Sequence, residues 1–442
     1  MKWAIYNLLF LAVYPFLLPG FLARMLKRGG YAARFGDRFA LYPQEILEKL
    51  GARPVSHDFA KGEFVWIHAV SVGEVQVAGQ LMREWRKVEP EVRFCFSTTS
   101  STGWKTAEKE VAERDVLIYN PLNFPNFVKS AFRTVRPRAV VLTESEIWPN
   151  FIHRARKYGI PLFLVNARVS DRSAPRYRLA KCFFGDVFRS FTRIFAQSEL
   201  DKARLVAAGA PADRTDVTGS FKFDVARRNP AKEEELRAWV GAGRILLGGS
   251  TWPGEDEVLL GIYGRLLAQA ADGNVDLRLV IAPRHFEKAD AVEANIRKFG
   301  FGCIRRSRGE GRKTARGQKT EDERREVFLA DTTGELMGLY GIADVVFVGK
   351  SLCAHGSQNM IEPCLCGKPT VVGPHTENFR PVMSDLLEGE GIVQVRNAAE
   401  LEAKVGELLA SGTALGARAQ AAVARRCGVV PKCVTAIREA IR

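Results

Sequence analysis

A chain of 442 residues is too long for one ordinary hydrophobic core, so its length favours two or three domains. Hydrophobic residues make up 46% of the chain and charged residues 26%, a balance that excludes a wholly disordered protein. The formal net charge of +15 predicts an anionic partner, and charge alone does not distinguish nucleic acid, anionic lipid and a phosphorylated substrate.

The first predicted element is an apolar helix over Trp3–Ala23, a stretch without a charged residue. As a helix it would extend about 31 Å, close to the thickness of a hydrocarbon core. A basic cluster follows it: Arg24, Lys27, Arg28, Arg34 and Arg38. By the positive-inside rule, this cluster places the downstream chain in the cytoplasm. We therefore expect residues 1–30 to be a membrane anchor.

Two questions about this anchor stay open. A cleaved signal peptide is the main alternative, but no small-residue cleavage site closes the apolar stretch and the basic cluster would oppose export. Pro15 and Pro19 would kink a spanning helix, so the segment could instead lie in the membrane interface.

Beyond the anchor, short apolar runs alternate with helical stretches. Buried runs separated by amphipathic helices indicate a parallel sheet covered on both faces. The runs in the first half are Phe64–His68, Val92–Phe96, Val116–Tyr119, Ala139–Leu142, Leu162–Val165 and Ile194–Ala196. Those in the second half are Ile245–Leu247, Leu277–Ile281, Val327–Leu329, Val345–Val348 and Thr370–Val372.

The charged stretch Asp224–Gly243 contains Pro230 and separates the two sets of runs, as an interdomain connection does. We therefore predict an α/β protein of two Rossmann-like, doubly wound domains, residues 31–224 and 225–442, behind the anchor. The almost wholly polar stretch Arg305–Arg325 is predicted to be a surface loop.

Loops directly after strands are where doubly wound sheets bind ligands. In the first domain, Glu74 falls at the start of a helix, where the dipole favours the ionised carboxylate that a general base needs. On spacing alone, a residue that only complements the helix dipole is the favoured interpretation. Glu144 and Glu146 follow a buried strand and could be helix caps, and Lys222 between two phenylalanines is typical of a surface lysine.

The second domain carries more such loops. Gly249 and Ser250 open a helix after a strand and could cradle a phosphate with backbone N–H groups. Arg284 follows another strand and offers a forked cation. Two further helix starts lie at Thr332–Leu336 and Gly356–Pro363. Each motif alone is weak evidence, but together they indicate a nucleotide site.

The eight cysteines form no Cys-x-x-Cys pair and are expected to be free thiols in a reducing compartment. A metal site from Cys364, Cys366 and His355 is the alternative, although its spacing matches no structural zinc pattern.

The ordered motifs resemble the Kdo transferases of lipopolysaccharide synthesis, which move 3-deoxy-D-manno-octulosonic acid (Kdo) from its CMP ester onto a lipid A precursor. The resemblance covers nearly the whole chain, beginning with the apolar N-terminus and Phe35–Arg38. Its most specific stretches are Ser71–Glu74, Glu144–Asn150, Val165–Arg168, Thr218–Asp224, Pro283–His285, Gly334–Met337 and Gly373–Thr376.

This resemblance implies roles for particular residues. Glu74 is implied to be the proton acceptor, and Glu144 and Lys222 to support the transition state. The implied CMP site comprises Pro283, Arg284, Thr333, Gly334, Glu335, Asn359, Met360, Ile361 and Glu362. It also implies GT-B architecture, inversion of the anomeric centre, and a reaction that uses no metal and no cofactor. The resemblance places the enzyme at the cytoplasmic side of the inner membrane.

The sequence departs from the family pattern at two positions. Gln358 stands where the family commonly has His before the nucleotide-binding Asn, so this position can donate a hydrogen bond but carries no charge. Asp37 replaces a customary Glu near the anchor.

Three other functions remain as alternatives. They are a transferase using a UDP- or ADP-sugar, a nucleotide-sugar epimerase, and a basic nucleic-acid-binding protein. The last is disfavoured because the chain has no recognisable RNA or DNA module.

Overall fold

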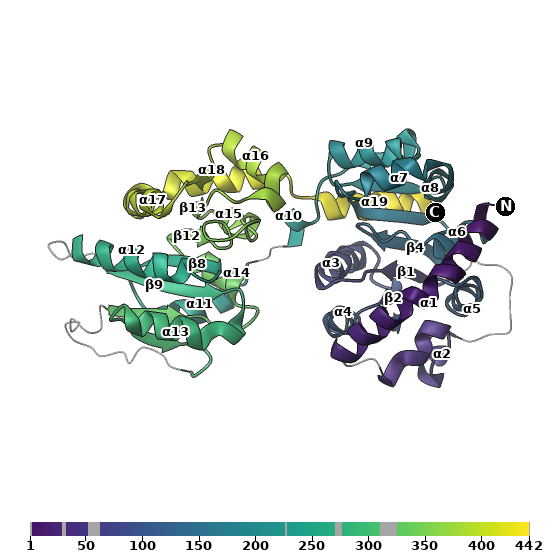
Figure 1. Ribbon diagram of the computed structural model, residues 1–442, viewed down its shortest axis with the longest axis horizontal. Helices are drawn as coiled ribbons and strands as arrows, with labels where there is room; N and C mark the ends of the chain where they lie inside the picture. Colours follow the sequence, from purple (N-terminus) through teal and green to yellow (C-terminus); the bar gives the residue numbers. More distant parts are fainter. Residues whose placement is uncertain are drawn as a thin grey trace. The chain divides into compact units, whose positions relative to one another are not determined.

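The computed structural model describes residues 2–28, 32–51, 62–225, 228–269, 276–309 and 325–441. The chain divides into two compact units (Figure 1). Unit 1 comprises Met1–Val225 together with Gly428–Arg442, and unit 2 comprises Ala226–Cys427.

Unit 1 is built on a parallel sheet of seven strands in the order β3-β2-β1-β4-β5-β6-β7. The strands are β1 (Phe64–His68), β2 (Arg93–Thr98), β3 (Val116–Tyr119), β4 (Pro137–Thr143), β5 (Leu162–Ala167), β6 (Arg193–Ala196) and β7 (Thr215–Val217). The order reverses between β1 and β4, which is the topological switch point of a doubly wound sheet. The six strands predicted for this half are all present, because each is a buried apolar run.

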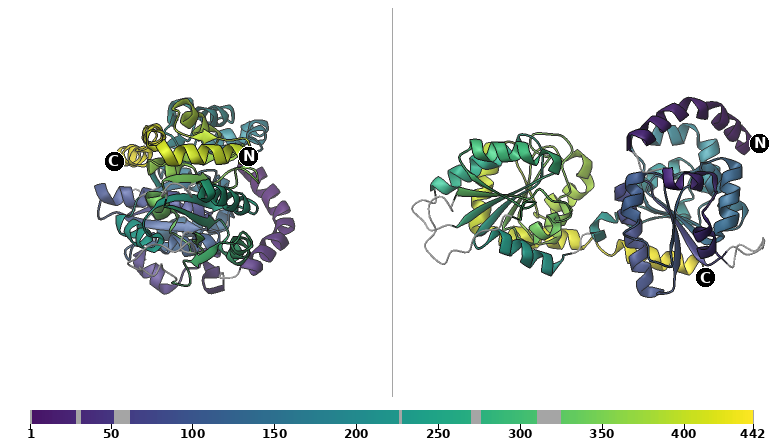
Figure 2. Two further views of the ribbon diagram at one scale, coloured as in Figure 1. Left: turned by 90° about the vertical axis from the view of Figure 1, so that its left-hand side faces the viewer. Right: turned by 90° about the horizontal axis from the view of Figure 1, so that it is seen from below.

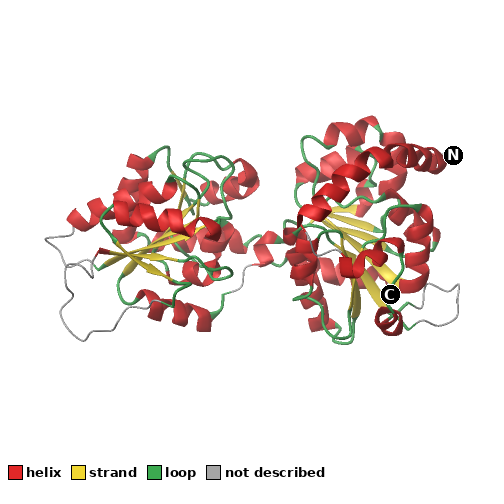
Figure 3. Ribbon diagram, turned by 60° about the horizontal axis from the view of Figure 1, so that its bottom comes forward, coloured by secondary structure: helices red, strands yellow, loops and turns green. Residues whose placement is uncertain are grey.

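Helices cover both faces of this sheet (Figure 3). They are α2 (Gln44–Lys49), α3 (Val72–Val88), α4 (Ser101–Ala107), α5 (Pro125–Val135), α6 (Pro149–Lys157), α7 (Ala174–Leu179), α8 (Lys181–Phe188), α9 (Glu199–Ala207), α10 (Lys222–Val225) and α19 (Val429–Ile441). Alternate residues of β1 face two different cores: Trp66 packs with Phe132 and Phe151, whereas Val65 packs with Trp85.

The first helix, α1 (Lys2–Arg28), lies along the outside of unit 1 (Figure 2). One face is docked: Trp3 stacks on His153 with ring centroids 4.3 Å apart, and Tyr6 stacks on Phe183 at 5.0 Å. The other face is apolar and exposed, comprising Ile5, Leu8, Leu9, Leu11, Val13 and Phe16. Within the described part of the chain, no helix combines the length and apolar character that crossing a bilayer requires.

Unit 2 has a second parallel sheet, in the order β10-β11-β9-β8-β12-β13-β14. Its strands are β8 (Arg244–Thr251), β9 (Leu277–Pro283), β10 (Gly302–Arg305), β11 (Glu326–Leu329), β12 (Val345–Val348), β13 (Thr370–Val372) and β14 (Val393–Gln394). Its helices are α11 (Pro230–Val240), α12 (Glu255–Gln269), α13 (Ala289–Lys298), α14 (Leu336–Ile342), α15 (Ile361–Leu365), α16 (Arg380–Glu388), α17 (Ala398–Ser411) and α18 (Thr413–Ala424). The switch point lies between β8 and β12.

The observed units differ from the sequence-based division in the place of α19, which that division leaves in the second domain. Val429, Val430 and Val434 of α19 share a core with α3, and Asp224 accepts hydrogen bonds from the N–H groups of Gly428 (2.6 Å) and Val430 (2.8 Å). The end of the chain therefore returns to unit 1. Most of the predicted polar loop Arg305–Arg325 lies outside the described residues.

Candidate functional site

In unit 1, the candidate site lies at the switch point, where the loops after β1 and β4 meet the loops after β5 and β7. Glu74 starts the helix after β1, Glu144 and Glu146 follow β4, Asn166 and Arg168 lie at the end of β5 and just beyond it, and Lys222 starts the short helix α10 after β7. All of them belong to motifs that the sequence singled out. Ligands of doubly wound sheets bind at such an edge.

Glu74 sits in the first turn of α3 and is held by hydrogen bonds. Its carboxylate accepts from the backbone N–H of Val70 (2.9 Å) and from the Ser71 hydroxyl (3.0 Å), while Ser71 Oγ accepts from the N–H of Glu74 (3.2 Å). This pattern resembles a capping box, except that the carboxylate accepts from the N–H of Val70 in place of that of the N-cap residue Ser71. The structural role that spacing favoured for Glu74 is thus present, and the carboxylate is fixed in position next to the other acids.

Glu144 occupies a backbone conformation that is rare for a residue with a side chain, with φ at 51°. Its carboxylate accepts a hydrogen bond from Asn166 Nδ2 (3.2 Å) and lies 3.8 Å from Arg168 Nε. Burial raises the pKa of Glu144, and the neighbouring Glu74 carboxylate adds to that, while Arg168 and Lys222 lower it. Two cations therefore favour the ionised form in a site that otherwise disfavours charge.

Asn166 connects these acids to the loop that bears Lys222. Its φ is also left-handed, at 52°, a conformation that Asn tolerates better than most residues. Besides donating to Glu144, it accepts a hydrogen bond from the backbone N–H of Phe221 (3.0 Å), the residue before Lys222. One side chain thus sets the spacing of Glu144 and Lys222, although no motif assigned it a role.

Glu146 is a further buried acid of this cluster that the sequence did not assign to the site. Burial raises its pKa to about 7, helped by the carboxylates of Glu74 and Glu144 and opposed by a hydrogen bond from Trp148 Nε1 (2.8 Å). His68 Nε2 lies 3.8 Å from its Oε2. Burial lowers the pKa of His68 to about 4, so this histidine is neutral and the contact is not an ion pair at neutral pH.

Replacing Glu146 with Gln should make unfolding less sensitive to pH. The native carboxyl keeps its proton up to about pH 7, whereas an unfolded one releases it near 4.5. Between these values the native state loses stability as the pH rises, by about 3 kcal/mol in total. We expect the variant to melt at a higher temperature than wild type at pH 8 and at a similar temperature at pH 5. If the melting temperatures of the two proteins change with pH by the same amount across this range, the assignment is contradicted.

In unit 2, a cavity of about 140 Å³ lies at the carboxyl ends of β8 and β9. Six predicted ligand-binding residues line it: Ser250, Pro283, Arg284, Thr333, Gly334 and Glu335. Gly249 does not, and the ring of Tyr340 fills the space that a side chain at this position would need. Gly334 has a φ of 85°, which permits the turn into α14.

Two charged residues of this cavity behave differently. Arg284 is exposed, and its guanidinium has no hydrogen-bond or ion-pair partner among the described residues, so it is available to an anion. The carboxylate of Glu335 already accepts hydrogen bonds within the protein. Burial opposes its charge, but the hydrogen bonds from Arg306, Lys232 and Thr332 lower its pKa to about 2. Its carboxylate therefore fixes the loop.

The predicted residues after β12 do not line this cavity. Asn359 donates to Glu362 Oε1 (3.0 Å) and accepts from the N–H of Ile361 (3.1 Å), while Met360 and Ile361 are fully buried. Burial raises the pKa of Glu362, and Arg284 lowers it, so the two predicted groups are electrostatic neighbours.

A buried carboxylate that the sequence did not single out positions this loop. Glu255, at the start of α12, accepts hydrogen bonds from the N–H groups of Lys350 (2.8 Å), Ser351 (3.1 Å) and Leu352 (3.1 Å). The sequence around Glu255 does not indicate this role, because the N–H groups from which it accepts are almost 100 residues away in the chain.

The alternative metal set of Cys364, Cys366 and His355 is not what the structure assembles. Both cysteines are buried free thiols, and His355 is exposed. The groups gathered around His355 are His375 and Glu377.

Comparison with known proteins agrees with the motifs. Residues 33–225 match the family model described as 3-deoxy-D-manno-octulosonic-acid transferase (kdotransferase). The chain is 32% identical over 410 residues to the 3-deoxy-D-manno-octulosonic acid transferase of Haemophilus influenzae, covering 92% of this chain and 90% of that protein. It is 34% identical over 377 residues to that of Bordetella pertussis, covering 83% of each.

Solved structures support the architecture. Anabaena Alr3699/HepE in complex with UDP matches with a TM-score of 0.54 at 16% identity, over 85% of this chain and 99% of that one. A putative UDP-N-acetylglucosamine 2-epimerase from Listeria monocytogenes matches with a TM-score of 0.57 at 15% identity, over 86% and 96%. At such identities these matches show the fold alone: two parallel-sheet α/β domains of GT-B type. The sequence relatives go further, and the chain belongs to the 3-deoxy-D-manno-octulosonic acid transferases, the glycosyltransferases of lipopolysaccharide synthesis.

Proposed function

We propose that this enzyme transfers Kdo from CMP-Kdo to a lipid A precursor with inversion of the anomeric centre, using Glu74 as the general base and no metal in the transfer step. The observation that carries the proposal is the cluster at the switch point of unit 1. There, a fixed carboxylate lies beside Glu144, which is itself paired with cations.

The proposed chemistry follows from these groups. A sugar hydroxyl is a poor nucleophile, so a carboxylate must take its proton as the new glycosidic bond forms, and Glu74 has this role. Glu144 and Lys222 stabilise the charges that develop in the transition state. CMP departs as a stable anion that needs no general acid.

The donor is assigned to unit 2. Arg284 would bind the phosphate, and the loops that carry Thr333–Glu335 and Asn359–Glu362 would complete the CMP site. Of the phosphate loop that the sequence predicts at Gly249 and Ser250, only Ser250 lines the cavity.

Nucleotide protection tests the donor assignment. We expect CMP to raise the melting temperature of the protein at concentrations at which UDP and ADP have little effect. Stronger protection by UDP or ADP would instead favour a transferase or epimerase that uses another nucleotide sugar.

For the membrane, we propose that α1 inserts its exposed apolar face into the cytoplasmic leaflet of the inner membrane, as a shallow anchor. Leu8 is 69% exposed and Phe16 is 84% exposed, while the opposite face of α1 is docked on unit 1. A spanning orientation would require those docked aromatic contacts to break. The net charge of +15 adds attraction to anionic lipids and to a phosphorylated acceptor.

Replacing Leu8 and Phe16 together with Ser should release the protein from membranes. Each side chain contributes roughly 1.5–3 kcal/mol when it is fully buried in an apolar phase, so partitioning to anionic vesicles should fall by about 100-fold or more. Sedimentation with vesicles measures this. The matched control is Leu179→Ser, which removes an exposed leucine (91% exposed) from α7. Equal partitioning of the double variant and the control would contradict the insertion of this face.

A further inference from the structure

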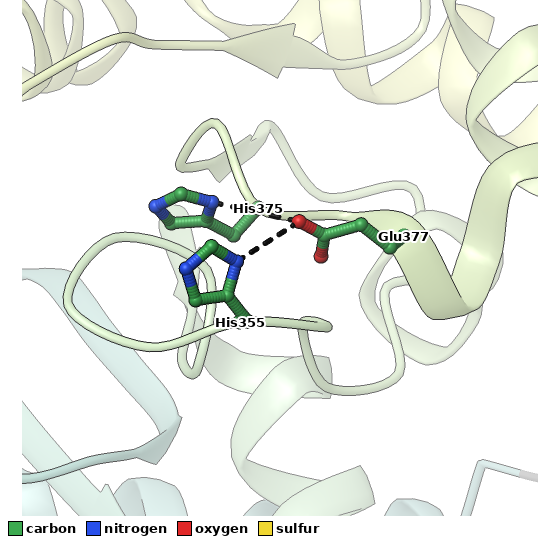
Figure 4. Close-up of side chains that lie close together, drawn as sticks. All are labelled: His355, His375 and Glu377. Atoms are coloured by element: carbon green, nitrogen blue, oxygen red, sulfur yellow. Dashed lines mark hydrogen bonds and ion pairs between the residues drawn. The ribbon is translucent and has the colours of Figure 1, made fainter.

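Outside the sites described so far, three side chains of types that bind metals point toward one another from two loops of unit 2 (Figure 4). His355 lies on the loop after β12, His375 on the loop after β13, and Glu377 at the start of the short helix Glu377–Phe379. Glu377 Oε1 lies 3.1 Å from His355 Nδ1 and 3.5 Å from His375 Nδ1. The proposed transfer mechanism uses none of these residues.

The spacing of these atoms fits a metal centre. Ligands about 2.0–2.2 Å from a tetrahedral ion are separated from one another by roughly 3.3–3.6 Å. The two measured separations lie at or near this value, and one ligand atom from each of the three residues lies within 4.8 Å of the others. Two imidazoles and one carboxylate leave a fourth position for water or an anion.

The loops that carry the three ligands are held in place by the rest of unit 2. The N–H of His375 donates to the carbonyl of Ser351 (3.0 Å), and Gln394 Nε2 donates to the carbonyls of Gly373 and Pro374, both at 3.3 Å. Glu255 anchors residues 350–352, just before His355. The backbone is thus fixed on both sides of the cluster before any ion binds.

We propose that His355, His375 and Glu377 bind one divalent transition-metal ion of the zinc class. Mixed imidazole and carboxylate ligands favour zinc, cobalt, nickel or copper over magnesium and calcium, which prefer oxygen ligands alone. The side chains of His355 and His375 are 78% and 31% exposed, so an ion can reach them from solvent. The ion joins the loop after β12 to the loop after β13. The binding does not depend on the proposed transfer reaction.

The test is equilibrium titration of the full-length protein, freed of metal by a chelator, with Zn²⁺ in competition with a chromogenic indicator. We expect one tightly bound equivalent, and an affinity lower by roughly 100-fold or more in His355→Ala and in His375→Ala. Glu377→Gln should also weaken binding. The matched control His285→Ala removes another exposed histidine of unit 2 and should bind as wild type does.

Cobalt substitution identifies the ligands independently. The Co²⁺ form should show visible absorption without the intense near-ultraviolet band of a cobalt–thiolate bond, because no cysteine is among the ligands. The proposal is overturned if no stoichiometric equivalent binds, if His355→Ala and His375→Ala bind as tightly as wild type, or if the thiolate band appears. Circular dichroism of each variant shows that a loss of binding is not a loss of fold.

Discussion

Glu74→Gln is expected to lower the rate of Kdo transfer by about 100- to 10,000-fold, the usual contribution of a positioned general base. Gln at this position can still accept a hydrogen bond from Val70 N through its carbonyl oxygen, and its NH2 group can donate to Ser71 Oγ, so the start of α3 should stay intact. The substitution therefore removes basicity and leaves the capping function. Initial rates with saturating donor and acceptor, together with a melting curve, measure the two effects separately.

The control for this prediction is Ser71→Ala, which does the opposite. It removes the side chain that caps α3 and should cost about 0.5–2 kcal/mol of stability, but it keeps the Glu74 carboxylate and the hydrogen bond that the carboxylate accepts from Val70 N. We expect it to melt earlier than Glu74→Gln while retaining much more activity. If Glu74→Gln keeps near-native turnover, the carboxylate of Glu74 only caps the helix.

The second large effect is expected at Arg284. Replacement with Ala should weaken CMP binding by roughly 10- to 150-fold, corresponding to about 1.5–3 kcal/mol for hydrogen bonds to a charged group. Arg284→Lys should recover part of this loss, because the charge remains but the fork that matches a phosphate does not. Isothermal titration with CMP measures the change directly.

Arg297→Ala is the matched control, because Arg297 is a solvent-exposed arginine of unit 2 that pairs with Glu293 on α13. It should bind CMP as wild type does. If Arg284→Ala and Arg297→Ala bind CMP equally well, Arg284 is not a donor ligand and the cavity beside it is not the phosphate site.

The eleven strands predicted from the sequence are present because each is largely a run of buried apolar residues. The edge strands β7, β10 and β14 were missed because they are short and partly exposed. The neighbourhood of Glu74 and Glu144 also follows from pattern, since Glu74 starts the helix after β1 and Glu144 directly follows β4, two strands that a doubly wound sheet places side by side. The position of α19 could not be predicted from the sequence. Its apolar face matches a core in either unit, and only the contacts with α3 and Asp224 decide between them.

Other features of the site depend on three-dimensional environment. The raised pKa of Glu146 comes from burial and two neighbouring carboxylates, and the positioning role of Asn166 comes from a left-handed backbone conformation that brings Glu144 and Phe221 together. The cluster of His355, His375 and Glu377 exists because β12 and β13 are adjacent in the sheet. A local sequence pattern records none of these three conditions.

Product analysis tests the central claim most directly. The purified protein is incubated with CMP-Kdo and a tetra-acylated lipid A precursor in vesicles, and the lipid is weighed by mass spectrometry. The account predicts a mass gain of one or more Kdo residues, release of CMP, and no gain with Glu74→Gln. An unchanged acceptor mass with folded wild-type protein, or an equal gain with Glu74→Gln, would contradict it.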